Sequence, residues 1–335
     1  MRSLRTRRYA GRTSVHLRFF NPGFDDNAAA RQRPRGPENS ASAASFRPGG
    51  RCLKLRAHPR FLFPGSPMPA TLHPASTPTH LAAAGSLLLI TGGSRGIGAA
   101  TARLAAQAGW HVVLGYASDA AAAEAVVAEL HALGVMAWAL QADVADEAAV
   151  GRLFSQVDTL CARNALVLRG LANNAGVVDR AQRLDEMSGE RLRRMVAVNL
   201  LGSLYCAREA VRRMSTRHGG TGGAIVNLSS VAGRLGAPGQ YVDYAATKGA
   251  IDTFTLGLAR EVATEGVRVN AVRPGVIDTE IHASGGQPER AWQLAPQIPM
   301  QRPGAADEVA QAVVWLLSPA ASYTTGAVLD VTGGR

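Results

Sequence analysis

Residues 86–90 form a short apolar run, in which polar and apolar residues do not alternate. It leads directly into the glycine-rich segment Thr-Gly-Gly-Ser-Arg-Gly-Ile-Gly at 91–98, after which an alanine-rich stretch extends to about residue 108. Such a run predicts a parallel strand that is covered on both faces. The glycines let the backbone turn tightly and approach a pyrophosphate, which then lies at the N-terminus of the next helix. No Gly-Lys-Ser/Thr follows, which argues against a P-loop. The segment therefore predicts the strand–turn–helix of a dinucleotide-binding α/β fold.

The rest of the chain continues this alternation of strands and helices. Further strands are predicted over residues 111–116, 136–141, 165–171, 224–228 and 327–331, and helices over 120–133 and 243–265. Alternating strands and helices indicate a parallel sheet with helices on both faces. We therefore expect one catalytic domain over residues 85–335.

Charge is distributed unevenly along the chain. Residues 1–84 hold 14 Lys and Arg against three Asp and Glu, whereas residues 85–335 hold 22 of each, so the net charge of +11 comes from the leader. The leader is rich in Arg, Pro, Ser and Ala and has no sustained periodicity, a composition typical of disorder. We interpret it as a start assigned upstream of Met68, since a globular pattern begins soon after that residue. A cleaved targeting peptide and a basic tail for nucleic acid or acidic lipid remain alternatives.

The neutral remainder argues against nucleic-acid binding by the folded domain. Its cysteines, like the one in the leader, form no Cys-x-x-Cys or Cys/His cluster; the three are Cys52, Cys161 and Cys206. That pattern predicts free thiols in a reducing compartment such as the cytoplasm, and no metal site. No apolar run approaches the roughly 18 residues that a membrane-spanning helix needs.

Cofactor preference is predicted from the end of the strand at 111–116. An NAD site places a carboxylate there for the ribose 2′-hydroxyl, but residues 114–118 read Leu-Gly-Tyr-Ala-Ser. The nearest acid, Asp119, is assigned to the following helix, and Arg95 in the glycine-rich segment suits a 2′-phosphate. The prediction is NADP(H) rather than NAD(H), with Asp119 reaching back as the alternative. Asp143, at the end of the next strand, is positioned to accept a bond from an adenine amino group.

Lysine is rare in this chain, which makes Lys248 informative. Only two of the 36 basic residues are lysine, and Lys248 follows Tyr244 at helical spacing. The pair therefore shares one helix face. An ammonium beside a phenol is expected to lower the phenol's pKa toward neutrality. The alternative is a chance pair on an exposed helix.

These motifs occur in one order, and together they resemble the short-chain dehydrogenase/reductase family over residues 86–335. The resemblance rests on Thr91–Gly98, Asp143, Asn173-Asn174-Ala175-Gly176, Asn199, Ser230, Tyr244, Lys248 and Pro274-Gly275 with Thr279. It implies one doubly wound Rossmann domain with a mostly parallel seven-stranded sheet and helices on both faces. The catalytic residues it implies are Asn199, Ser230, Tyr244 and Lys248. The cofactor-binding residues it implies are Gly92, Ser94, Arg95, Gly96, Ile97, Gly98, Asp143, Val144, Asn173, Ala175, Gly176, Tyr244, Lys248, Pro274, Gly275, Ile277 and Thr279.

The resemblance also implies a reaction, in which a carbonyl is reduced to an alcohol or the reverse. Tyr244 would supply the proton, Ser230 would polarise the carbonyl oxygen, and Lys248 would lower the tyrosine pKa and bind the nicotinamide ribose. Asn199 would hold a water for proton supply, and Thr279 would bind the carboxamide. A small-molecule substrate and a homo-oligomer, a tetramer, are expected. Alternatives are a 3-oxoacyl-carrier-protein reductase or sugar dehydrogenase of the same family, and a regulator that senses NADP(H) without turnover.

Two further segments are interpreted from their composition. Residues 278–300 break periodicity and are expected to form a mobile lid over the substrate; His282 within it is expected to be incidental. The segment 189–217 is expected to be one long amphipathic helical segment. Its basic face is interpreted as solvated surface, with the Arg212, Arg213 and Arg217 cluster as the place where an acidic carrier protein would bind; the face consists of Arg191, Arg193, Arg194, Arg208, Arg212 and Arg213.

Overall fold

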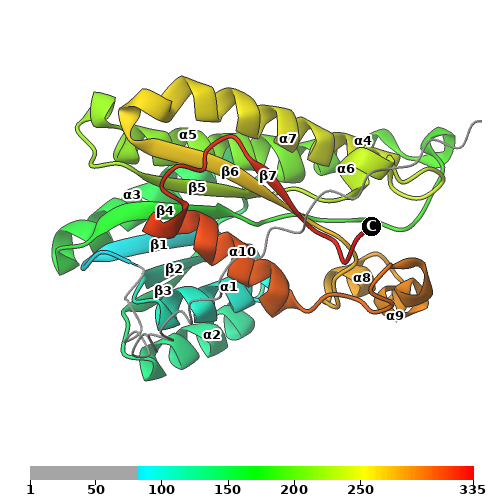
Figure 1. The fold of residues 1–335 in the computed structure, drawn as a ribbon, viewed down its shortest axis with the longest axis horizontal. Helices are drawn as coiled ribbons and strands as arrows, with labels where there is room; N and C mark the ends of the chain where they lie inside the picture. Colours follow the sequence, from blue (N-terminus) through cyan, green and yellow to red (C-terminus); the bar gives the residue numbers. More distant parts are fainter. Residues whose placement is uncertain (1–81) are drawn as a thin grey trace, which may run out of the picture. The chain divides into compact units, whose positions relative to one another are not determined.

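The computed structural model describes residues 82–335, so the leader expected to be disordered lies almost wholly outside the described residues. These residues form one seven-stranded sheet in the order β3-β2-β1-β4-β5-β6-β7, with helices packed on both sides (Figure 1). Every strand pair is parallel, which confirms the predicted fold class and makes the sheet wholly rather than mostly parallel. The strands are β1 (Ser86–Thr91), β2 (His111–Tyr116), β3 (Ala137–Gln141), β4 (Val167–Asn173), β5 (Gly223–Leu228), β6 (Val267–Pro274) and β7 (Val328–Val331).

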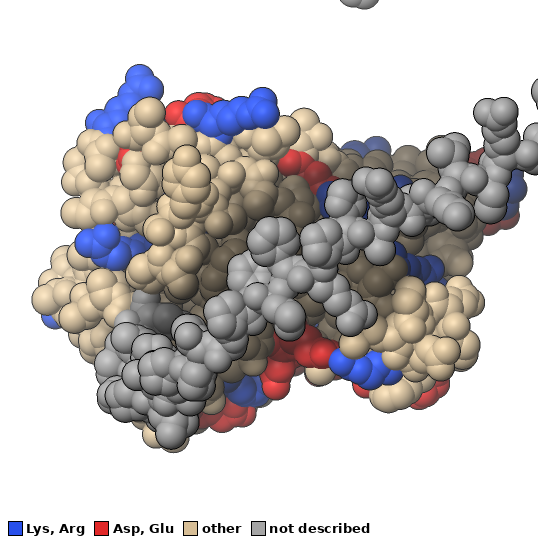
Figure 2. All heavy atoms as spheres, viewed as in Figure 1, with Lys and Arg blue, Asp and Glu red and all other residues tan. Residues whose placement is uncertain are grey.

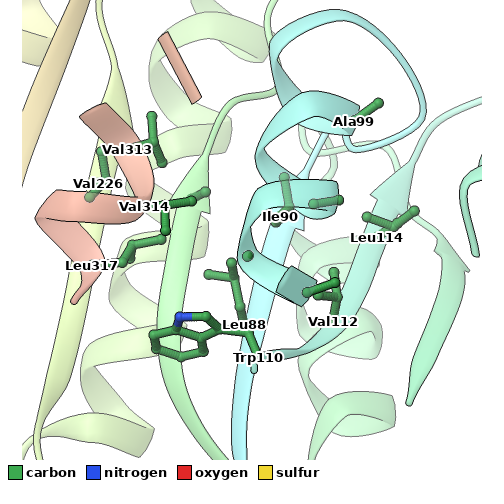
Figure 3. Packing of buried hydrophobic residues seen from close by; sticks show 14 of the residues in the cluster. Leu88, Ile90, Ala99, Trp110, Val112, Leu114, Val226, Val313, Val314 and Leu317 are labelled. Atoms are coloured by element: carbon green, nitrogen blue, oxygen red, sulfur yellow. The ribbon is translucent and has the colours of Figure 1, made fainter. Parts of the chain in front are cut away.

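Strand β1 divides the core into two layers because its side chains alternate between the faces of the sheet. Leu88 and Ile90 face one layer and Leu87 and Leu89 the other, and all four are fully buried. Figure 3 shows part of the first layer, where Trp110 lies beside Leu88 of β1 and residues of α10 lie beside Val226 of β5. The longer helices are α1 (Gly96–Gln107), α2 (Ala120–Ala132), α3 (Glu147–Asn164), α4 (Gly189–Val196), α5 (Gly202–Met214), α7 (Val242–Val262) and α10 (Ala306–Leu317).

Several boundaries differ from the sequence-based expectations. Strand β4 begins two residues later than expected because Ala165 has a left-handed conformation at the end of α3 and cannot extend the strand. The segment 189–217 is not one helix: a π-helical turn, Ala197–Leu201, separates α4 from α5. Strand β6 and helices α3 and α10 had not been located from the sequence.

The order of the strands determines where a ligand can bind. From β1 the chain adds strands toward one edge of the sheet as far as β3, and from β4 it adds them toward the other edge. This switch between β1 and β4 creates a crevice at the carboxyl ends of these two strands. The glycine-rich turn follows β1 and Asn174 follows β4, so both lie at this crevice. Within residues 82–335, no helix is long and apolar enough to cross a membrane.

Candidate active site

The turn between β1 and α1 is shaped to receive a phosphate group. Gly92 and Gly96 have φ of +64° and +52°, a backbone region that favours glycine. A Cβ on Gly98 would lie 2.2 Å from the carbonyl oxygen of Gly92, so no larger residue fits. The first turn of α1 carries no acidic residue, which leaves the positive end of the helix free for an anion. The turn therefore fits a dinucleotide pyrophosphate.

Asn174 secures this turn, a role that was not assigned to it from the sequence. Its side-chain amide donates to the carbonyl oxygens of Thr91 at 3.0 Å and Gly92 at 2.8 Å. The Thr91 hydroxyl in turn accepts from the backbone N–H groups of Asn174 and Ala175, each at 3.0 Å. These bonds join the ends of β1 and β4 and fix their relative position at the crevice. The signal was present in the Asn-Asn-Ala-Gly motif, but which asparagine faces the turn depends on the fold.

Asn173, expected to bind cofactor, directs its side chain into the protein interior instead. Its amide donates to the Ser203 carbonyl oxygen and to Asn227 Oδ1, each at 3.0 Å, and the residue is 3 % exposed. Asn227 donates onward to Thr255. Asn173 is the last residue of β4, and successive side chains along a strand point to opposite faces of the sheet. Only its backbone remains available to a ligand at the crevice.

The end of β2 carries no carboxylate that is free to reach a ribose. Asp119 accepts a hydrogen bond from the backbone N–H of Ala122 at 3.0 Å and caps α2, as its assignment to the next helix predicted. Arg95 lies exposed at the N-cap position of α1. Asp143 is exposed at the end of β3, with one oxygen bound to the Ala145 N–H, while Val144 is buried against Gly202.

Ser230 and Tyr244 meet at the carboxyl end of β5. The Ser230 side chain opposes the burial that raises the pKa of Tyr244, and its hydroxyl accepts from the Ala232 N–H at 3.1 Å. Ser229 points the other way and donates to the backbone carbonyl oxygen of Lys248 at 3.1 Å. The structure therefore places Ser230, not Ser229, toward the tyrosine.

Burial dominates the pKa shifts of both Tyr244 and Lys248. It raises the pKa of Tyr244 to about 12, and the Ser230 side chain acts in the opposite direction. This is contrary to the expected lowering by Lys248, because the ammonium lies 5.6 Å from the centroid of the phenol ring and directs a 2.6 Å bond to the Leu228 carbonyl oxygen. Burial lowers the pKa of Lys248 to about 8, and Asp252, one turn further along α7, opposes that shift.

Asn199 occupies the π-helical turn between α4 and α5 and is fully buried. Its side chain accepts from the Val177 N–H at 2.8 Å and donates to the Val177 carbonyl oxygen at 2.9 Å. A Cβ on Gly176 would lie 3.1 Å from Asn199 Oδ1 and 3.7 Å from Lys248 Nζ. Glycine at 176 thus leaves space between the amide and the ammonium. π-Turns occur frequently at functional sites.

The chain after β6 completes the crevice. Gly275 donates to the Val331 carbonyl oxygen, and a Cβ there would lie 2.8 Å from the Thr332 backbone, so glycine is required. Pro274 accepts a 2.9 Å bond from the Val231 N–H, which links β6 to the segment that carries Ser230. Ile277 is buried.

Thr279 lies beside the glycine-rich turn. A Cβ on Gly96 would meet its side-chain carbons at 3.5 Å. Two residues far apart in the sequence thus border the same space. Ser94 and Ile97, which lie before and after Gly96 in the turn, are partly buried, as Thr279 is.

The segment expected to be a lid has structure of its own. It contains the short helices α8 (Ile281–Ser284) and α9 (Arg290–Gln293), and Ala291 and Ile298 pack against Val276 in a separate small core. His282 Nε2 donates a 2.9 Å bond to the Ile277 carbonyl oxygen. The segment 278–300 is connected to the start of α7 through Arg290, which donates to Gln240 at 2.8 Å and lies over the Tyr241 ring.

Comparisons with known proteins give the family. Residues 92–335 match the family described as enoyl-(acyl carrier protein) reductase. The chain is 51 % identical over 250 residues to the uncharacterized oxidoreductase YgfF of Escherichia coli, covering 75 % of this chain and all of that protein. It is 38 % identical to the 3-oxoacyl-[acyl-carrier-protein] reductase FabG of Staphylococcus aureus, over 73 % of this chain and 96 % of that one. The chain belongs to the short-chain dehydrogenase/reductase family.

Solved short-chain dehydrogenase/reductases share its fold. One from Mycobacterium marinum has a TM-score of 0.70 at 30 % identity, covering 76 % of this chain and 96 % of its own. One from Burkholderia cenocepacia, in complex with NADP, has a TM-score of 0.66 at 35 % identity, covering 75 % and 97 %. The protein is therefore an oxidoreductase of the CH–OH/C=O class that uses NAD(P).

One expectation about the surface arginines of this short-chain dehydrogenase/reductase is wrong. Arg191 is not solvated: it is 7 % exposed and bound to Asp243. The three arginines expected to meet an acidic carrier also contact acids of the chain, namely Glu209, Asp158 and Glu265, while the Arg212 and Arg217 side chains stay 58 % and 75 % exposed. Figure 2 shows positive and negative side chains interspersed on the visible face, with no single basic patch. Among the described residues, no group of three or more His, Cys, Asp or Glu could hold a metal ion.

Proposed function

We propose that this protein is an NADP(H)-dependent carbonyl reductase, also able to oxidise the corresponding alcohol, with Ser230, Tyr244 and Lys248 as its catalytic residues. The observation that carries the proposal is the meeting of Tyr244 with Ser230 beside a glycine-rich turn that fits a pyrophosphate. NADPH, when bound, supplies the reducing hydride.

The chain's own groups account for the remaining chemistry. Tyr244 is a protonated acid at neutral pH, since burial raises its pKa to about 12. The Ser230 hydroxyl donates to the substrate oxygen where negative charge develops, a placement that lowers the barrier. Lys248 would bind the nicotinamide ribose, since its ammonium lies beside the Tyr244 ring without lowering the pKa of that phenol. Asn199 and Lys248 border the space beside Gly176, where a water would return a proton to the tyrosine.

NADP(H) is preferred in this proposal because Asp119 is committed to capping α2 and Arg95 is exposed at the glycine-rich turn. The residues that would hold the cofactor are Gly92, Ser94, Arg95, Gly96, Ile97, Gly98, Asp143, Val144, Asn173 through its backbone, Ala175, Gly176, Tyr244, Lys248, Pro274, Gly275, Ile277 and Thr279. The relative FabG is a 3-oxoacyl-carrier-protein reductase, and the Burkholderia structure contains NADP. Both support a reductase that uses NADPH.

The active form is proposed to be a cytoplasmic homotetramer. An apolar groove between α4 and α7 offers one interface to a second copy; it is lined by Leu184, Leu192, Val196, Leu200, Val242 and Ala246. Leu184 and Val196 are 59 % and 42 % exposed within the single chain. Light scattering at assay concentration measures the assembly, and a monomer there would contradict it.

The substrate is to be found with a panel of small ketones, sugars and 3-oxoacyl thioesters, followed by NADPH absorbance. Tyr244→Phe should abolish turnover with the best substrate and bind NADPH almost as well as wild type, as fluorescence titration would show. Tyr323→Phe is the matched control, because Tyr323 is fully exposed. Normal turnover by Tyr244→Phe would place the acid elsewhere. NADPH binding with no turnover of any substrate would instead favour a sensor.

A further inference from the structure

Arg191, on α4, forms a buried ion pair with the residue that directly precedes the proposed catalytic tyrosine. Its Nε lies 2.8 Å from Asp243 Oδ2 and its Nη2 lies 3.2 Å from Asp243 Oδ1. The two side chains are 7 % and 2 % exposed. Two parallel bonds fix the carboxylate in both distance and orientation, which a single contact would not do. Asp243 lies in the first turn of α7, where a negative charge also stabilises the helix end.

The same guanidinium holds a second segment. Its Nη1 donates to the Arg180 carbonyl oxygen at 2.6 Å and to Gln182 Oε1 at 3.2 Å. The Gln182 N–H donates to the Gln240 carbonyl oxygen at 3.0 Å, which joins this loop to the chain entering α7. One buried cation therefore connects α4, the loop after β4 and the start of α7.

Both connected segments end at groups of the active site. Tyr244 directly follows Asp243. The loop after β4 contains Val177, whose backbone holds the Asn199 amide through two hydrogen bonds. Its next residues also support the lid, since a Cβ on Gly285 would lie 3.3 Å from the Asp179 carbonyl oxygen. Arg191 thus lies at the junction that sets where Tyr244 stands relative to Asn199.

We propose that Arg191 and Asp243 act as a positioning pair, which holds the Tyr244 phenol in the geometry required for proton transfer. The inference rests on the proposed function. Neither residue is among the proposed catalytic or cofactor-binding residues, so each acts through the backbone of α7. A displacement of about 1 Å at a reacting group can cost roughly 10²-fold in rate, and a junction of three segments is where such a displacement would arise.

Removing both charges together distinguishes a positioning role of the pair from a contribution to fold stability. Losing one partner leaves a buried charge uncompensated and is strongly destabilising, whereas apolar replacement of both is often neutral or stabilising. The test variant is therefore Arg191→Leu/Asp243→Leu, with Arg191→Lys as the conservative change that retains charge but not the planar fork. Arg194→Leu is the matched control, because Arg194 is an exposed arginine of the same helix.

We expect the double variant to melt within a few degrees of wild type and to bind NADPH with an unchanged Kd, while its kcat falls roughly 10²-fold. The kcat of Arg191→Lys should lie between those of wild type and the double variant, and the kcat of Arg194→Leu should match wild type. Full turnover by a stably folded double variant would overturn the proposal, because the pair would then serve stability alone.

Crystal structures of wild type and the double variant supply a readout that needs no substrate. The Tyr244 phenol should lose its contact with Ser230 in the double variant, and an unchanged contact would overturn the positioning role. The proposed function fails separately, through a wild-type protein that turns over no carbonyl compound. In that case the two crystal structures still decide whether the pair positions the phenol.

Discussion

The ammonium of Lys248 donates a 2.6 Å hydrogen bond to the backbone carbonyl oxygen of Leu228, the last residue of β5. Lys248 is 4 % exposed, and a Cβ on Gly176 would lie 3.7 Å from its ammonium. The lysine is thus tied to the sheet edge that carries the serine and is directed past the tyrosine ring.

Lys248→Arg should lose more than nine-tenths of turnover although the charge is retained. The wider guanidinium cannot occupy the same buried space between the strand end and the phenol. Steady-state kcat with NADPH and the best substrate measures the effect. A variant that keeps more than about a tenth of wild-type turnover, a barrier change under about 1.4 kcal/mol, would refute the special role of lysine.

Reduction should slow as pH rises through about 8, where Lys248 loses its proton in the free enzyme. The charged groups along this side of α7 are Asp252, which raises the pKa of Lys248, and Arg273, which binds Asp252 at 2.8 Å. Removing the carboxylate disfavours the ammonium, so Asp252→Asn should move the alkaline limb of the kcat/KM profile to lower pH. Asp307→Asn, an exposed acid on α10, is the control. An unmoved limb would mean that another group titrates.

The wild-type enzyme should prefer NADPH, measured as the ratio of kcat/KM for the two cofactors. Arg95→Ala should reduce that ratio, since the exposed guanidinium is the group available to a 2′-phosphate. Asp119→Ala should leave the ratio unchanged and cost about 1 kcal/mol in the free energy of unfolding through loss of the α2 cap. A wild-type preference for NADH would instead implicate Asp119.

Arg268→Leu should lower the free energy of unfolding by about 2–4 kcal/mol. The partly buried guanidinium donates to four backbone carbonyl oxygens at and beyond the end of α10, those of Leu316, Leu317, Ser318 and Thr324. Its loss removes a donor from each of these acceptors, although the Thr324 oxygen still accepts from Asn270 at 2.9 Å. Chemical denaturation compares the variant with Arg260→Leu, an exposed arginine of α7. Equal stability of the two variants would mean that water replaces the guanidinium without cost.

A chain that starts at Met68 should retain fold, cofactor binding and catalysis. The relative YgfF is matched over its whole length by 75 % of this chain, and every site residue lies at or beyond Gly92. The change removes all 14 basic and three acidic leader residues, so the net charge falls from +11 to zero and retention on a cation exchanger should weaken. Loss of activity, or a melting temperature several degrees lower, would show that the leader packs on the domain.

The sequence by itself determined the class of fold and supplied the proposed site residues, because both depend on local patterns. The run at 86–90, the glycines that follow and the Tyr-x-x-x-Lys spacing each specify a backbone shape or a shared helix face without reference to distant residues. Asp119 was assigned to α2 on the same basis.

Only the tertiary structure decided which side chains face the crevice and which face the core. Asn173 and Asn174 are adjacent and identical in type, yet one enters the interior and the other secures the glycine-rich turn. Arg191 shares a helix with exposed arginines but meets Asp243, 52 residues further along the chain, and is buried. The pKa of Tyr244 likewise depends on burial rather than on the spacing of Lys248. Burial and long-range partners arise only when distant segments pack, so no local pattern contains them.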